Sequence, residues 1–179
     1  MPLVVTFKPE EDESGFGYYR RLATRNSLWG WRELAGLANV SRHRSGLMGR
    51  SEHVAAELGL EDEWSKYAKD REEECRRWRG LHRVSSDAIC PECFREEPYL
   101  RNHWDHAYVT TCPIHRVHLV DHCQACGEML TANRQHIEQC ACGQDLRMLR
   151  STAATSSQIW LSSLLASNGA SSAGVQPKL

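Results

Sequence analysis

Apolar residues recur at helical spacing along the first third of the chain. They predict one helix from Ser14, as its N-cap, to about residue 26, and a second helix after Ser27 to about residue 38. A third helix is expected to start from Ser51, again as N-cap, and to end before Gly59, which suits a left-handed C-cap. The side chains on the buried faces of these helices are Phe16, Tyr19, Leu22, Ala23, Trp31, Leu34, Ala35, Ala38, Val54, Ala55 and Leu58.

A fourth helical pattern, over residues 61–79, is the clearest of all. Three acids open it and three arginines close it before Gly80, an order that complements the helix dipole. Its apolar stripe includes Cys75. This thiol is therefore predicted to be a small core residue and not a metal ligand.

The composition changes near residue 81. Residues 81–149 hold seven of the eight cysteines and seven of the nine histidines, with short β-type runs at 108–111 and 118–120. This combination predicts small β-ribbons around metal.

After Arg150 the chain becomes rich in Ser, Ala and Thr, which predicts a flexible tail. The apolar stretch 159–165 is expected to form a short amphipathic helix that either packs back on the body or docks a partner. The chain thus divides into a helical region (1–80), a metal-binding region (81–150) and a tail (151–179).

Metal-ligand side chains occur in four pairs along the middle region. Two thiolates separated by two residues converge on one ion, because the intervening backbone folds into a tight knuckle. Two pairs have this Cys-x2-Cys spacing, one is Cys-x2-His and one is Cys-x-Cys. Four pairs predict two structural zinc ions, each with a closed tetrahedral shell and no open position for water. The pairs are Cys90 with Cys93, Cys112 with His115, Cys123 with Cys126, and Cys140 with Cys142.

The simplest assignment is sequential, with the first two pairs forming one site and the last two pairs forming the other. The spacing leaves two alternatives open: the pairs can interleave as a cross-brace, and His118 or His122 can replace His115. His115 is favoured because it completes a two-residue spacing with a cysteine.

The 179 residues suffice for one ordinary domain or two small ones. No Gly-rich phosphate loop, nucleophile elbow or zinc-protease motif occurs, so the protein is predicted not to be an enzyme. The chain has no apolar run of about 18 residues and no secretory signal, so it is expected to stay in the cytoplasm and not to cross a membrane. A reducing compartment also suits thiols that bind metal.

The 22 basic and 23 acidic residues give a net charge of −1, which by itself does not predict nucleic-acid binding. The charge is uneven, however, because segment 39–50 is basic and is expected to form a loop. Such a loop can contact the phosphates of DNA or RNA, which we favour slightly, or an acidic protein surface. The candidate contact residues are Arg42, His43, Arg44 and Arg50.

Further residues accompany the metal pairs in a fixed order. Glu13-Ser14, Gly17-Tyr18 and Arg21-Leu22-Ala23 stand near the N-terminus. The residues that follow among the four metal pairs are Tyr99, Arg101, Trp104, Leu119, Gly127, Leu130, Gly143 and Leu146. In this order the series resembles the TniQ/TnsD family, the target-selection proteins of bacterial transposons.

The resemblance implies an N-terminal helical region of helix-turn-helix character followed by two tandem zinc ribbons. It also implies a non-catalytic adaptor in a bacterial cytoplasm. Such an adaptor links a target-recognition complex, either a DNA site or a CRISPR effector with guide RNA, to an AAA+ ATPase regulator of the TnsC/TniB type and so to the transposase. The alternative function is a zinc-dependent protein that binds a DNA sequence by itself, without an effector complex.

Overall fold

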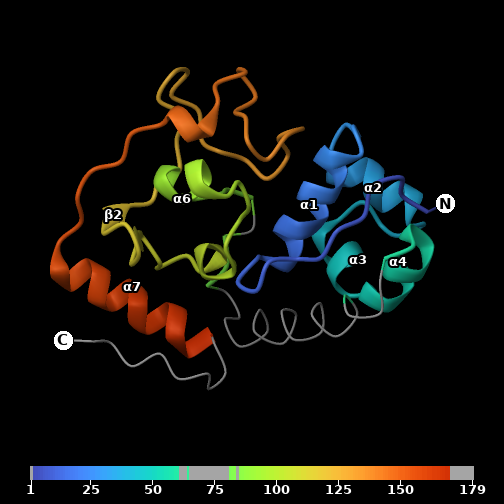
Figure 1. Cartoon of the computed structure of the whole chain (residues 1–179), viewed down its shortest axis with the longest axis horizontal. Coiled ribbons are helices and arrows are strands. Elements are labelled where there is room, and N and C mark those ends of the chain that lie inside the picture. The colour runs from blue at the N-terminus through green and yellow to red at the C-terminus, as the bar shows by residue number, and fades with distance from the viewer. Residues whose placement is uncertain (1, 61–63, 65–80, 84, 170–179) are drawn as a thin grey trace.

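The computed structural model describes residues 2–60, 64, 81–83 and 85–169, and the chain is mostly helical with one small sheet (Figure 1). The predicted combination of helices with a little β-structure is therefore confirmed. The fourth predicted helix and Cys75 lie outside the described residues, except for Trp64. The elements, with 3-10 helices written η, are α1 (Gly15–Arg25), α2 (Trp31–Leu37), α3 (Arg44–Met48), α4 (Ser51–Leu58), α6 (Pro91–Glu96), η1 (Asn102–Asp105), β1 (Thr111–Cys112), β2 (Val117–His118), η2 (Leu146–Met148) and α7 (Ser156–Gly169).

Two helix ends agree with the prediction in detail. Ser14 caps α1, because its side-chain oxygen accepts a hydrogen bond from the Gly17 N–H at 3.2 Å. Gly59 closes α4 with φ of 68°, in the left-handed region where glycine is favoured.

Other helix boundaries differ from the prediction. α2 starts after Gly30 and not after Ser27, and Ser51 is the first residue of α4 rather than its cap. The segment 39–50, expected to be a loop, contains the short helix α3, which buries Leu47 and Met48. Five residues are too few to produce a helical repeat that can be recognised in the sequence.

A β-ribbon was predicted within residues 81–150, which we call the metal-binding half after that prediction. The ribbon is confirmed but is shorter than expected. β1 and β2 pair antiparallel over two residues each, with Thr111 opposite His118 and Cys112 opposite Val117. Isolated bridges continue the pairing elsewhere, as between Ile89 and Val120. Much of this half is therefore irregular chain held at separate points.

The described residues form two hydrophobic clusters. One joins the helices of the first half and includes Tyr18, Tyr19, Leu22 and Trp64. The other lies in the metal-binding half, where Phe94, Leu100 and Trp104 pack with five cysteines. The cysteines of this second cluster are Cys90, Cys93, Cys112, Cys123 and Cys140.

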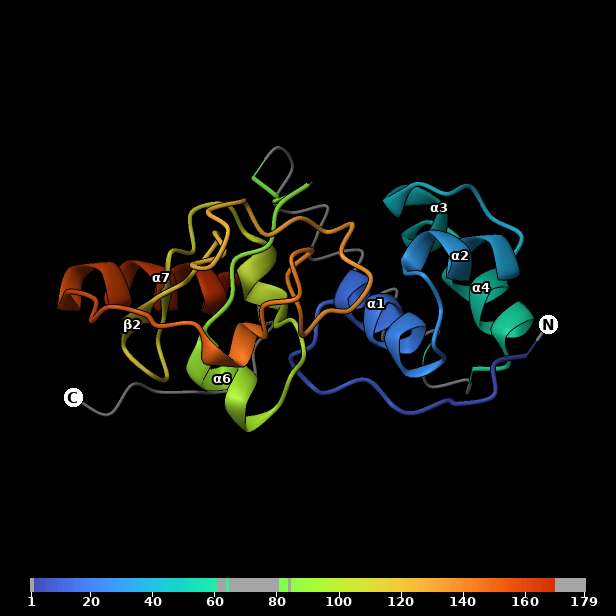
Figure 2. The ribbon, with the colours of Figure 1, turned by 90° about the horizontal axis from the view of Figure 1, so that it is seen from above.

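A polar boundary, which we call the seam, joins the N-terminal helices to the metal-binding half. The seam runs along α1, which lies between the remaining N-terminal helices and the metal-binding half in both views (Figures 1 and 2). At its centre Asp87 is buried between two arginines. Arg20 donates to both carboxylate oxygens at 2.8 and 2.9 Å, and Arg134 donates at 2.5 Å. Burial alone would raise the pKa of Asp87, but the two guanidinium groups hold it below its usual value.

Further contacts extend the seam toward the start of α1. The Ser14 hydroxyl donates to Asp105 at 2.7 Å, and Arg44 donates to the same carboxylate oxygen at 2.9 Å. The backbone also approaches closely, because a Cβ on Gly17 would lie only 2.8 Å from the Cβ of Leu100. The seam residues are Asp12, Ser14, Arg20 and Arg44 on one side and Asp87, Arg101, Asp105 and Arg134 on the other.

α7 covers part of the metal-binding half and lies at the end of the molecule away from α2–α4 (Figure 1). It is longer than the predicted apolar stretch, and it packs back on the body. The Ser162 hydroxyl accepts hydrogen bonds from the N–H groups of Thr110 and Thr111, and Ile159 is buried. Within the described ranges, no helix has both the length and the apolar character needed to span a membrane.

Replacing Asp87 tests the seam. Asp87→Ala leaves two buried guanidinium groups without their carboxylate, so we expect a loss of about 3–5 kcal/mol in the free energy of unfolding, measured by denaturant titration at neutral pH. The wild-type contribution should disappear as the pH falls through the lowered pKa of Asp87, since it requires the ionised carboxylate.

The matched control is Arg25→Ala, which removes a half-exposed ion pair to Glu138 across the same boundary. It should change the stability by no more than about 1 kcal/mol. Equal effects of the two substitutions would contradict the structural role of the buried triad.

Candidate metal centres

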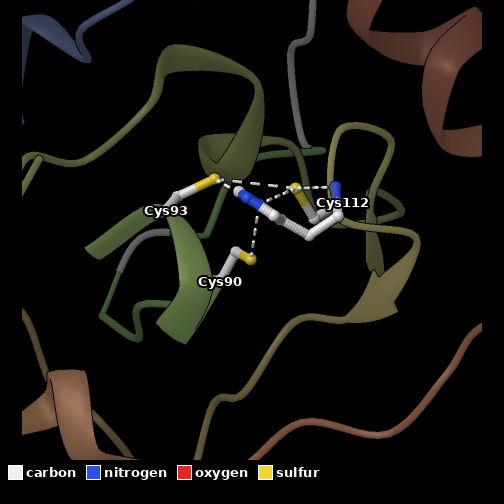
Figure 3. A group of neighbouring side chains, drawn as sticks. Cys90, Cys93 and Cys112 are labelled. Atoms are coloured by element: carbon white, nitrogen blue, oxygen red, sulfur yellow. Dashed lines mark hydrogen bonds between the residues drawn. The ribbon is translucent and has the colours of Figure 1, made fainter. Parts of the chain in front are cut away.

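Four ligand side chains of the first predicted site meet where α6 faces the β1–β2 ribbon. Cys90 is the N-cap of α6, Cys93 lies in its first turn, and Cys112 ends β1. Figure 3 shows these three side chains converging. His115, in the turn between the strands, directs Nδ1 toward them, at 3.6 Å from Cys90 Sγ, 3.3 Å from Cys93 Sγ and 3.7 Å from Cys112 Sγ.

These distances fit a tetrahedral metal shell. With Zn–S bonds of about 2.3 Å and a Zn–N bond of about 2.05 Å, the edges of the tetrahedron are about 3.8 Å between sulfurs and about 3.6 Å between sulfur and nitrogen. The Cys93 and Cys112 sulfurs are 3.6 Å apart. The ligand atoms of each set lie within 4.8 Å of one another.

The second set has the same compactness in a more exposed place. Cys123 Sγ lies 3.7 Å from Cys142 Sγ, and Cys126 Sγ lies 3.8 Å from Cys140 Sγ. Cys126 and Cys142 are exposed, whereas all three cysteines of the first set are buried. The second set is therefore more accessible to solvent than the first, in which only His115 is partly exposed.

Two glycines shape the knuckles of the second site. Gly127 and Gly143 each follow a cysteine and have φ of 76° and 89°. These left-handed values strain any residue with a side chain, which explains glycine at both positions. Although burial opposes it, the backbone N–H groups of Cys126 and Ala125 lower the pKa of Cys123 to about 7.

The thiols of the first set influence one another strongly. Hydrogen bonds from Cys90 and Cys93 hold the pKa of Cys112 well below its usual value, and the hydrogen bond to Cys112 raises the pKa of Cys93 well above its own. Several thiolates this close together repel one another unless a cation compensates their charge. A divalent metal ion bound by the set would compensate the negative charge of its thiolates.

Glu96 supplies an outer contact that the sequence analysis missed. Its Oε1 lies 3.0 Å from His115 Nε2, so the neutral imidazole can donate this N–H and present Nδ1 to a metal. Glu96 stands three residues after Cys93 on α6. Residues at this spacing are neighbours on a helix surface, so the sequence could have indicated that Glu96 lies beside the ligand set.

The structure groups the ligands sequentially and not as a cross-brace. It also brings His115, and neither His118 nor His122, to the first set. His118 lies in β2, and His122 forms an exposed contact with Asp121 at 2.8 Å. The predicted positions of all eight ligands therefore converge, while the binding of metal to them stays a prediction.

The four basic residues of segment 39–50 do not share one environment. Arg42, His43 and Arg50 are exposed. Arg44 is half-buried in the seam, where it pairs with Asp105 and stacks 4.8 Å from the ring centre of Phe16. Contact of this segment with phosphate stays a prediction.

A family model of TniQ matches residues 4–119. The chain belongs to the TniQ family. The match covers the N-terminal helices and the whole first ligand set, while the second set lies beyond it. No curated protein matches the chain significantly.

Family membership makes this TniQ protein a transposition-associated protein. Proteins of the TniQ family are generally non-catalytic transposition factors. Each described set has four Cys or His side chains, so a metal ion held by all four would have no position left for a substrate or a reactive water.

A pair of histidine substitutions tests the first site. We expect His115→Ala to lower the zinc content of purified protein from two ions per chain toward one and to reduce the thermal stability, because it removes one of four ligands. His122→Ala is the matched control and should keep both ions. Elemental analysis and thermal denaturation measure these outcomes, and an unchanged metal content in His115→Ala would contradict the assignment.

Proposed function

We propose that this TniQ protein is a non-catalytic adaptor in DNA transposition. It links a target-recognition complex to an AAA+ ATPase regulator and so to the transposase. Two structural zinc ions, one in each ligand set, hold its metal-binding region as tandem zinc ribbons. The target-recognition complex is a protein assembly on a DNA site or a CRISPR effector with its guide RNA.

The buried triad of Arg20, Asp87 and Arg134 is the observation that carries this proposal. An adaptor must keep two binding surfaces at a fixed separation, and the triad fixes α1 to the metal-binding half. The three residues are far apart in the chain, so the triad holds the helical region and the metal-binding region together as one body. Breaking a buried pair of this kind is costly, which favours a rigid connection.

The two ends of this body offer different chemistry. The exposed Arg42, His43 and Arg50 lie beside α3, in the helical half. We assign them to the phosphates of DNA or RNA in the targeting complex, with α3 and α4 supplying the helix-turn-helix character. The metal-binding half, at the other end, then faces the ATPase.

Co-sedimentation tests the adaptor role. The zinc-loaded protein is mixed with the AAA+ ATPase of its own transposon, assembled on DNA with a non-hydrolysable ATP analogue. We expect pelleting that requires the ATPase, since the adaptor binds the protein assembly and not the bare DNA. The matched controls are DNA without ATPase and the same protein after removal of zinc by a chelator.

The alternative function predicts a different result. A protein that reads DNA by itself would bind one sequence with nanomolar affinity and strong salt dependence in the absence of ATPase. That outcome, or a failure to pellet with the assembled ATPase, would overturn the adaptor proposal.

A further inference from the structure

A groove runs between α6 and the segment that contains η2, on the metal-binding half. In both views the η2 segment, drawn in orange, lies beside α6 (Figures 1 and 2). The groove encloses about 390 Å³, and its lining includes Glu92 and Arg95 from α6 and Met148, Arg150 and Ser151 from the facing segment. Its lining contains none of the eight predicted ligands and none of the basic residues near α3.

The two candidate metal sites set the walls of this groove. α6 begins at Cys90 and contains Cys93, so the first site anchors one wall. Gln124 lies in the knuckle of the second site, and its side chain holds the Arg150 backbone through two hydrogen bonds, at 2.5 Å to the carbonyl and 2.9 Å from the N–H. The groove is therefore positioned before any partner arrives, which lowers the entropic cost of binding.

The three arginines at the groove differ in whether a carboxylate of this chain already pairs with them. Arg95 pairs with Glu92 and donates to the Arg147 carbonyl at 2.7 Å, and Arg147 pairs with Asp145 at 2.8 Å. Among the described residues, no carboxylate pairs with Arg150. One guanidinium group is thus free to bind an anionic group.

Two further groups lie beside Arg150. The Ser151 hydroxyl oxygen is buried, and the described part of the chain offers it no hydrogen-bond partner. The Met148 side chain is 70% exposed although it is apolar. A free guanidinium, an unused hydroxyl and an exposed apolar side chain together fit a ligand that has a carboxylate next to an apolar group.

We propose that this groove docks a short segment of the AAA+ ATPase that carries an acidic side chain beside an apolar one. The carboxylate pairs with Arg150, and it accepts a hydrogen bond from the Ser151 hydroxyl once a change of rotamer turns this buried group toward the groove. The apolar side chain of the segment covers Met148. This inference rests on the proposed adaptor function and identifies the surface by which the adaptor meets its ATPase.

Nucleic acid fits the groove less well. Binding to a phosphate backbone draws on several uncompensated cations, because the negative charge repeats along the strand. Here two of the three arginines are already neutralised by Glu92 and Asp145. Arginine and methionine are in addition enriched in protein interfaces.

A charge reversal in the groove provides the first test. Arg150→Glu should weaken binding to the ATPase filament at least tenfold in quantitative co-sedimentation, since it places like charges together. Arg116→Glu is the matched control, with the same change of charge at an exposed position of the metal-binding half that does not line the groove. It should leave binding unchanged, and both variants should retain two zinc ions per chain and the wild-type circular dichroism spectrum.

Photo-crosslinking provides a second test. A benzoylphenylalanine in place of Met148 should crosslink to the ATPase, whereas the same group in place of the exposed Ile114 should not. Proteolysis and mass spectrometry of the product should identify an acidic and apolar ATPase segment.

The outcomes separate this inference from the adaptor proposal. If the wild-type protein binds the ATPase but Arg150→Glu does so equally and Met148 gives no crosslink, the groove assignment is overturned and the adaptor role stands. If the wild-type protein does not bind the ATPase, both fail. If Arg150→Glu weakens binding to labelled DNA or RNA alone and leaves ATPase binding intact, the groove binds phosphate and the inference is wrong.

Discussion

Eight predicted metal-ligand side chains converge on two points in a part of the chain that has little regular structure. β1 and β2 contain two residues each, α6 contains six, and five of the cysteines belong to the hydrophobic cluster of this half. Compact sets of thiols need a cation to ionise together, and coordination in small structural sites contributes on the order of 10 kcal/mol to folding. Metal coordination is thus the interaction on which the proposed account of this half depends.

The constraint reaches the helical half through the seam. Asp87 precedes the first ligand pair by three residues, and Arg134 lies between the third ligand pair and the fourth. Fixing the two ligand sets therefore fixes Asp87, which binds Arg20 on α1, and Arg134, which donates to the same carboxylate. In this way a local coordination requirement orders the contact between regions that are remote in sequence. The groove beside α6 depends on the same two sets, because each of them anchors one wall.

Several local features of the structure could be predicted from the sequence, whereas contacts between distant segments could not. Ser14 and Gly59 were recognised because caps depend on the residue itself, and the ligand sets were recognised because knuckle spacing is a local property. Neither the partnership of Asp87 with two arginines nor the internal position of Arg44 has a local signal, since both depend on the packing of distant segments. α3 was too short for its periodicity to be read. The place of α7 on the body depends on the hydrogen bond from the Thr111 N–H to Ser162, a long-range contact that has no local signal.

The identity of the metal ligands is the central claim, and X-ray absorption at the zinc edge of the loaded protein tests it most directly. The seven cysteines and one histidine of the two sets predict an average first shell of 3.5 sulfur atoms and 0.5 nitrogen atoms per zinc, with Zn–S distances of about 2.3 Å. That result would support two closed structural sites. A shell rich in oxygen or nitrogen, or with fewer than three sulfur ligands, would contradict the account.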